Sequence, residues 1–146
     1  MPSWVARIDT PRRVLEQRTT AAVDGPSELE LRFEQLGSDG RFIAVFCSVP
    51  AWLTFYASYA AQVADVERPI DQDPPLGSGV LLDLRFSGDT NWLYPAPGST
   101  YSNAEVPLQT RLWAAVRTEQ AGPHAATVSV LALVEYDVPA LDQGSP

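Results

Sequence analysis

The sequence predicts an all-β protein, an antiparallel, jelly-roll-like β-sandwich of roughly eight short strands with an N-terminal arm. Apolar residues recur with a period of two in several short runs, which is typical of half-buried strands. Thirteen prolines and nine glycines separate these runs. A chain of 146 residues fits one domain. We therefore expect an arm at 1–12, a β-sandwich domain at 13–139 and a C-terminal tail at 140–146.

The clearest strand is expected at 28–36, where Leu29, Leu31 and Phe33 alternate with charged residues. The turn cluster GSDG follows. The next run, 41–49, is apolar on both faces, so we expect a central strand that forms a hairpin with the first. Further strands are expected at 79–87, 111–118 and 126–138, with a weaker one at 14–23. In the run 126–138 we expect Val128, Val130, Val134, Tyr136 and Val138 to share a face.

The alanine-rich segment YASYAAQVADVERP, 56–69, interrupts this β pattern. As a helix it would begin near Pro50 and run to Glu67, where Pro69 would end it. As part of a β protein it would be the end of a strand followed by a loop with one helical turn. Helix propensity favours the first interpretation and the neighbouring strands favour the second, so the residues leave both open.

The stretch LTFYASYAAQVADVERPIDQDPPLGSGVLLDLRF, 53–86, is similar to a pattern in small β-sandwich structural proteins of tailed bacteriophages. The resemblance covers about residues 42 to 139 and includes the element Trp92-Leu93-Tyr94-Pro95. In those proteins an Arg often stands where this chain has Gln62. The resemblance implies a strand followed by a structured loop rather than a long helix.

In such a loop Asp65 would accept hydrogen bonds from loop amides, and Arg68 would donate to carbonyls or to Asp65. The alternative is that both are solvated charges on a helix face.

Composition narrows the range of partners. The net charge is −8, with ten arginines and no lysine, and this acidic balance argues against nucleic acid. No apolar run reaches the roughly 18 residues that span a bilayer, so we expect no membrane association. The N-terminus has no hydrophobic signal core. The single Cys47 lies in an apolar run and is expected to be a small buried side chain.

No residue pattern indicates catalysis, a metal or a cofactor. The single His124 falls in an expected turn, and one His with one Cys cannot form a zinc site. Asp71 and Asp73 could bind Ca²⁺ but lack EF-hand spacing. Eighteen acids always allow some carboxylate pair, and nothing singles one out. We therefore predict that the protein is not an enzyme.

Tryptophan and arginine placement suggests a contact surface, because these residues dominate contact patches between proteins. If Leu112, Ala114 and Val116 face the core, their neighbours on the same strand face outward. The candidate contact residues are Arg111, Trp113 and Arg117 on that strand, Trp92, Tyr94 and Tyr101 in the preceding loops, and Trp4, Arg12 and Arg13 in the arm. Two alternatives stay open: a sugar-stacking platform, and a Trp113 that packs under a loop of its own chain.

With the resemblance, these features predict a non-enzymatic virion structural protein. A capsid decoration (cement) or minor head protein is expected, which would bind the major capsid protein or other virion proteins. A homo-oligomer, trimer or dimer, stays open. The alternative is a tail, neck or receptor-binding, carbohydrate-binding module. The expected location is the virion, assembled in the host cytoplasm.

Overall fold

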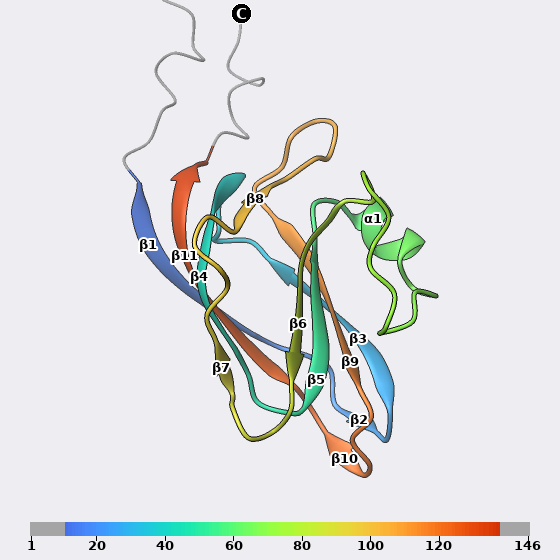
Figure 1. The fold of residues 1–146 in the computed structure, drawn as a ribbon. Coiled ribbons are helices and arrows are strands. Elements are labelled where there is room, and N and C mark those ends of the chain that lie inside the picture. Colours follow the sequence, from blue (N-terminus) through green and yellow to red (C-terminus); the bar gives the residue numbers. More distant parts are fainter. Residues whose placement is uncertain (1–10, 138–146) are drawn as a thin grey trace, which may run out of the picture.

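A computed structural model of the chain describes residues 11–137 (Figure 1), and Trp4, most of the expected arm and the tail lie outside them. The prediction of an all-β antiparallel fold is confirmed: the described residues form eleven strands and one short helix, against the roughly eight strands expected. The elements are β1 Arg12–Thr19, β2 Val23–Asp24, β3 Ser27–Phe33, β4 Asp39–Cys47, β5 Ala51–Tyr56, α1 Tyr59–Ala64, β6 Val80–Phe86, β7 Trp92–Leu93, β8 Thr100–Ser102, β9 Leu112–Thr118, β10 Pro123–His124 and β11 Thr127–Tyr136.

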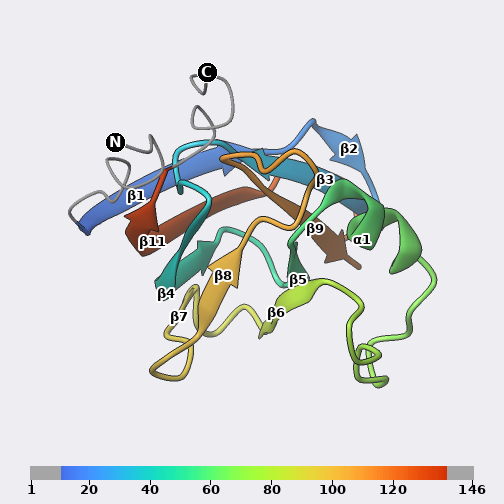
Figure 2. The same ribbon diagram turned by 90° about the horizontal axis from the view of Figure 1, so that it is seen from above.

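Two antiparallel sheets form the body of the molecule. Sheet I has the order β1-β11-β4-β7, and β8 also pairs with β4; sheet II has the order β3-β9-β5-β6. The short strands β2 and β10 pair separately. When β7 and β8 are taken as one position, the eight main positions run 1-8-3-6 in sheet I and 2-7-4-5 in sheet II. Successive long strands therefore alternate between the layers at several points (Figures 1 and 2).

The two sheets bury a common core. The alternating side chains predicted to face inward do so: Leu29, Leu31 and Phe33 from β3 meet Leu112, Ala114 and Val116 from β9 and Val128 and Val130 from β11. Phe55 of sheet II contacts Phe42 of sheet I at a ring distance of 5.0 Å. Cys47 is buried in this core, and burial raises the pKa of its thiol. This packing joins the layers through apolar burial.

The predicted hairpin between 28–36 and 41–49 is wrong. β3 pairs with β9 in sheet II, whereas β4 pairs with β11 in sheet I. The chain crosses between the sheets at Gly37, which has a positive φ of 66°. A side chain there would run into the carbonyl oxygen of Tyr136, so the crossing requires glycine.

Three further expectations need correction: where the first strand begins, and which way Tyr136 and Val80 face. β1 begins at Arg12, so Arg12 and Arg13 belong to the first strand rather than to an arm. A register shift between Val134 and Tyr136 ends the regular alternation of β11, and Tyr136 is exposed rather than buried with the valines. A bulge opposite Tyr56 likewise moves Val80 out of the main core, to a small cluster on the outer side of sheet II.

The alanine-rich segment is a strand followed by a loop with a short helix. β5 ends at Tyr56, and α1 covers only six residues. The Ser58 side chain caps α1 by accepting from the amide of Ala61. Ala61 packs in the cluster with Tyr56 and Ala115, so small residues let the helix approach the sheet closely. A helix of this length is not stable alone and depends on that contact.

Candidate functional site

The outward face of sheet II is covered by its own chain. α1 and the loop 65–79 lie over this face beside β5 and β9 (Figure 2). The cross-strand register places Arg117 between Glu28 and Trp52, and Trp113 between Arg32 and Tyr56. Trp52, Tyr56, Trp113 and Arg117 therefore meet the covering segment, whereas Glu28 and Arg32 on β3 stay exposed to solvent.

A buried ionic network holds the covering segment, α1 and the loop 65–79, on sheet II. Arg68 donates through Nε to Asp65 Oδ1 at 2.7 Å and through Nη2 to Asp65 Oδ2 at 3.1 Å. The same Nη2 lies 3.0 Å from an oxygen of Asp83 on β6. Tyr56 donates to Asp65 at 2.7 Å, and Arg117 donates to the Asp65 carbonyl at 3.0 Å. The Arg68 side chain is only 4% exposed, so the structure places Asp65 and Arg68 in a buried pair, not on a solvated helix face.

The network shifts the ionisation of its members. Burial alone would raise the pKa of the Asp65 carboxyl, but the hydrogen bonds from Arg68 and Tyr56 and the charges of Arg68 and Arg117 lower it below its ordinary value. Burial and the hydrogen bond to Asp65 raise the pKa of Tyr56. Asp65 is therefore charged and Tyr56 neutral over a wide pH range.

Trp52 lies between two guanidinium groups of the network. The Arg117 carbon Cζ is 4.0 Å from its ring centre and the Arg68 Cζ is 4.9 Å away. Its indole nitrogen donates to Asp83 at 3.1 Å, and Thr54 donates to the same oxygen at 2.6 Å. The ring is therefore occupied by the protein's own cations and offers no stacking surface for a sugar.

The outward positions of β9 contact their own chain. Trp113 stacks on Tyr59 of α1 with a ring distance of 4.8 Å. Arg111 donates to Glu105 at 2.8 Å, and Arg117 donates to Glu28 at 3.0 Å. The interpretation in which Trp113 packs under its own chain thus describes this strand, and the expectation that all three side chains form an open contact surface is corrected.

Tyr101, another predicted contact residue, lies in the core. It is 2% exposed, its ring lies 4.9 Å from that of Phe42, and its hydroxyl donates to the carbonyl of Leu36 at 2.7 Å. The turn 37–40 must pack against β8, and Tyr101 supplies the side chain for that packing. It is not available to a partner.

The outward face of sheet I is different. No helix or strand within residues 11–137 packs across it (Figure 1). Three cross-strand rows define the face, which contains these side chains: Arg13, Leu133 and Arg41; Leu15, Leu131 and Ala44; Gln17, Ser129, Phe46 and Trp92. Leu15 is 60% exposed. We call this set, with Ile43, the sheet I face.

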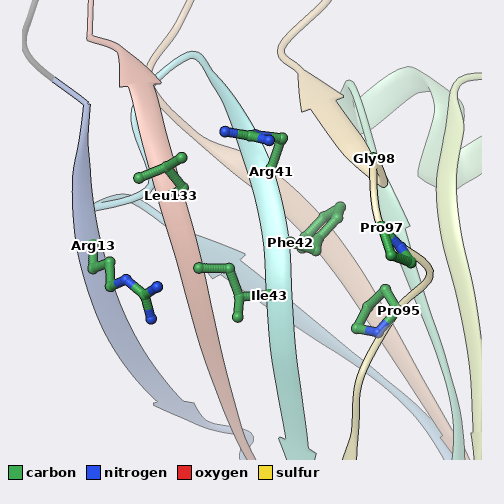
Figure 3. A pocket seen from close by; sticks show the side chains of 8 residues that line it. All are labelled: Arg13, Arg41, Phe42, Ile43, Pro95, Pro97, Gly98 and Leu133. Carbon is green, nitrogen blue, oxygen red and sulfur yellow. The ribbon is translucent and has the colours of Figure 1, made fainter.

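A pocket of about 350 Å³ opens on the sheet I face (Figure 3). Leu133 and Ile43 lie on its apolar side, Arg13 and Arg41 come from β1 and β4, and the loop 95–98 forms the far wall. Ile43 has no partner in the register because β4 carries a bulge there. Bulges commonly redirect side chains beside binding sites.

The predicted residues Arg13, Trp92 and Tyr94 lie on or beside the sheet I face. Trp92 is 38% exposed and packs on Phe46 at 5.3 Å, whereas Tyr94 is 75% exposed. Arg12 alternates to the other side of β1 and pairs with Asp137 at 3.6 Å. Sequence reasoning missed Leu15, Leu131 and Leu133. For Leu131 and Leu133 the available signal was that the run 126–138 has apolar residues at successive positions, which face both sides of a strand.

A larger pocket, about 520 Å³, lies beside Trp52 under the loop 65–79. Its cations already have partners: Arg68 binds Asp65 and Asp83, and Arg85 donates to the carbonyl of Ile70. Arg117 also lines the pocket and binds Glu28 and Asp65, although its Nη1 is buried without a hydrogen-bond partner. The arginines of this pocket thus mainly hold the loop 65–79 on sheet II.

The remaining candidates carry no further site. His124 lies in β10, with Nδ1 2.9 Å from the carbonyl oxygen of Gly122, and Asp71 and Asp73 are exposed in the covering loop. Residues 11–137 contain no group of three or more His, Cys, Asp or Glu placed to hold a metal ion. In the same part of the chain, no helix has the length and apolar character to cross a membrane.

No known protein family, curated protein or solved structure shows a significant match to this chain. The geometry of the two outward faces therefore carries the functional argument.

Proposed function

We propose that this chain is a non-enzymatic virion structural protein of a tailed bacteriophage, a capsid decoration (cement) or minor head protein. In this proposal the sheet I face binds neighbouring capsid subunits. The observation that carries it is a largely apolar face of sheet I that no helix or strand of residues 11–137 covers, whereas α1 and the loop 65–79 cover much of the opposite face.

The energetics favour a protein partner for this face. Leu15, Leu131, Leu133 and Ile43 stand on a rigid sheet, so a partner would bury them with little loss of backbone entropy. Apolar surface removed from water contributes about 25 cal/mol of binding free energy per Å², before the costs of association are subtracted. Contiguous exposed apolar surface of this kind commonly marks an interaction site.

The strand order gives a second line of support, by analogy. With β7 and β8 taken as one position, the orders 1-8-3-6 and 2-7-4-5 are compatible with the jelly-roll-like arrangement that the sequence predicts. Jelly rolls occur in viral capsid proteins and also in lectins and cupins. Because a fold hosts many functions, this analogy supports the virion proposal without separating it from glycan binding.

The second candidate is a tail, neck or receptor-binding module that binds carbohydrate. One observation favours it: Trp92 and Tyr94 are adjacent exposed aromatics at the edge of the sheet I face. Exposed aromatic rings can stack on sugars. Trp92 already uses one side against Phe46, so the platform would depend mainly on Tyr94.

Co-sedimentation with capsids assembled without this protein tests the proposal. Wild type should bind, and Leu131→Asp on the sheet I face should abolish binding. The matched control is Val66→Asp, an exposed apolar position on the covering loop of sheet II, which should bind like wild type. Absence of capsid binding together with selective signals on a glycan array would replace the proposal with the second candidate.

A further inference from the structure

We propose that the pocket between Arg13 and the loop 95–98 is the anchor point of the sheet I face, and that it receives a partner-protein segment in which an apolar side chain stands next to Asp or Glu. The inference rests on the proposed function only in assigning the sheet I face to a protein partner. It adds where the contact is centred and what chemistry the partner must present.

Among the arginines of residues 11–137, Arg13 is the one without a partner in that part of the chain. Nine arginines lie in residues 11–137. Eight of them form an ion pair with a carboxylate within 4.0 Å or a hydrogen bond to a carbonyl oxygen of the chain. Arg13 has no ion pair or hydrogen bond to its guanidinium among these residues, although acids outnumber basic residues by 18 to 10 in the sequence. An exposed, unpaired guanidinium beside an apolar pocket is suited to an external carboxylate.

The second cation of the pocket is only weakly neutralised. Arg41 faces Glu135 with a nitrogen–oxygen distance of 3.9 Å, longer than a direct hydrogen bond. The charged side chains that line the pocket are therefore two arginines, one of them in a long ion pair with Glu135. An incoming carboxylate would gain a planar, two-bond contact with Arg13, which guanidinium groups form readily.

The walls between the two cations are apolar and held in place. Leu133 and Ile43 line one side, and Pro95 and Pro97 line the other (Figure 3). The loop that carries the prolines is tied to β4, because the amide of Phe42 donates to the carbonyl of Ser99 at 2.9 Å. A rigid apolar cleft next to a charge matches an anchor in which an aliphatic or aromatic side chain inserts and its acidic neighbour meets Arg13.

Charge also argues against the other occupants. A nucleic acid would face a protein of net charge −8 with only two cations at the site. A second copy docked with its own pocket against this one would bring Arg13 and Arg41 of the two molecules together, and like charges across an interface oppose association. A distinct acidic–apolar protein segment avoids both penalties.

Selection of a random dodecapeptide display library on the purified full chain tests the inference. We expect the enriched peptides to share an apolar residue adjacent to Asp or Glu. A synthetic peptide of that consensus should lose affinity about tenfold or more with Arg13→Gln or Leu133→Ser. The matched control is Arg12→Gln, which removes the same charge one residue away on the other side of β1 and should bind like wild type.

Three results would overturn the inference: no enriched peptide, a consensus without an acidic residue, or equal binding by Arg13→Gln and wild type. Thermal unfolding of each variant confirms that the sandwich remains folded. Light scattering adds a further decisive outcome, since a dimer that Leu133→Ser dissociates would assign the pocket to a second copy.

The test separates this inference from the proposed function. If the acidic–apolar consensus is found but the chain does not bind capsids, the pocket assignment stands and the virion role fails. If capsids bind and Arg13→Gln binds them as wild type does, the virion role stands and the pocket assignment fails.

Discussion

The two outward faces of the sandwich are built from the same antiparallel strand geometry, but they differ in their side chains and in whether the chain covers them. On sheet II the outward positions hold Trp52, Arg117 and Asp83, and α1 with the loop 65–79 covers them. On sheet I the outward positions hold mainly apolar side chains, aliphatic and aromatic, and no described helix or strand covers them. The charged and aromatic residues of β9 that look like a contact surface thus bind segments of their own chain. The open face of sheet I is mainly apolar and has two arginines, Arg13 and Arg41.

The difference has a physical reason. A loop of fifteen residues with one six-residue helix has little apolar area to hold it on the sheet. Directional bonds from Asp65, Arg68 and Arg117 can fix it in one arrangement instead. Aliphatic side chains give no such direction, and they suit a face that is completed by a partner.

The largest expected effect is on the cover of sheet II. Asp65→Ala would leave Arg68 and Arg117 buried without their shared acceptor, and should lower the free energy of unfolding by about 3–5 kcal/mol. Urea denaturation measures this loss. Asp73→Ala, an exposed acid in the same loop, is the control and should change stability by less than about 0.5 kcal/mol. Equal effects of the two substitutions would mean that the network does not hold the loop.

The next largest effect distinguishes Trp113 from Trp92, because one should matter for stability and the other for partner binding. Trp113→Ala removes the ring that packs on Tyr59 and should cost about 2–3 kcal/mol of stability, since the side chain is only partly buried. Partner binding should be unchanged. Trp92→Ala should do the reverse, with a small change in stability and weaker partner binding. If Trp113→Ala left the melting temperature unchanged but weakened association, Trp113 would be an interface residue after all.

Acid should weaken the covered face selectively. The folded-state pKa of Asp65 is lowered from its ordinary value of 3.8, so its contribution to stability is full above that value and is lost as the pH falls through the folded-state pKa. Glu105, paired with Arg111, follows the same sign from an ordinary value of 4.5. Melting temperatures measured from about pH 6 to pH 2 should fall, and Asp65→Asn should flatten the fall. Asp71→Asn, at an exposed site, should leave the slope as in wild type.

The smallest expected effect on stability belongs to the open face. Leu15→Ser changes a side chain that is 60% exposed, so the free energy of unfolding should move by less than about 0.5 kcal/mol. Capsid binding should nevertheless fall, because the substitution removes apolar area from the sheet I face. A large loss of stability would show that Leu15 supports the fold of the isolated chain instead.

Period-two patterning made the strands and their inward faces predictable. Leu29, Leu31 and Phe33 point inward because alternation fixes the face of any half-buried strand. Pairing was not predictable in the same way, since β3 has the same pattern whether the next strand stays in its sheet or crosses to the other. The GSDG turn therefore suggested a hairpin where the chain changes layers.

The candidate sites likewise divide into contacts between near neighbours in the sequence, which could be predicted, and contacts made only by the tertiary fold, which could not. Asp65 and Arg68 are three residues apart, so their contact could be expected locally. Asp83 and Arg117 join them only through the tertiary fold, and no local pattern connects them. The sheet I face likewise assembles from β1, β4 and β11, and the sequence alone could not show that nothing in 11–137 would cover it.

The most direct measurement of the proposed virion role is a cryo-electron map of capsids incubated with this chain. We predict density for the sandwich on the shell, with the sheet I face against a neighbouring subunit and α1 turned toward solvent. A particle without this chain, or one in which the sheet I face is exposed and the covering loop of sheet II makes the contact, would contradict the assignment.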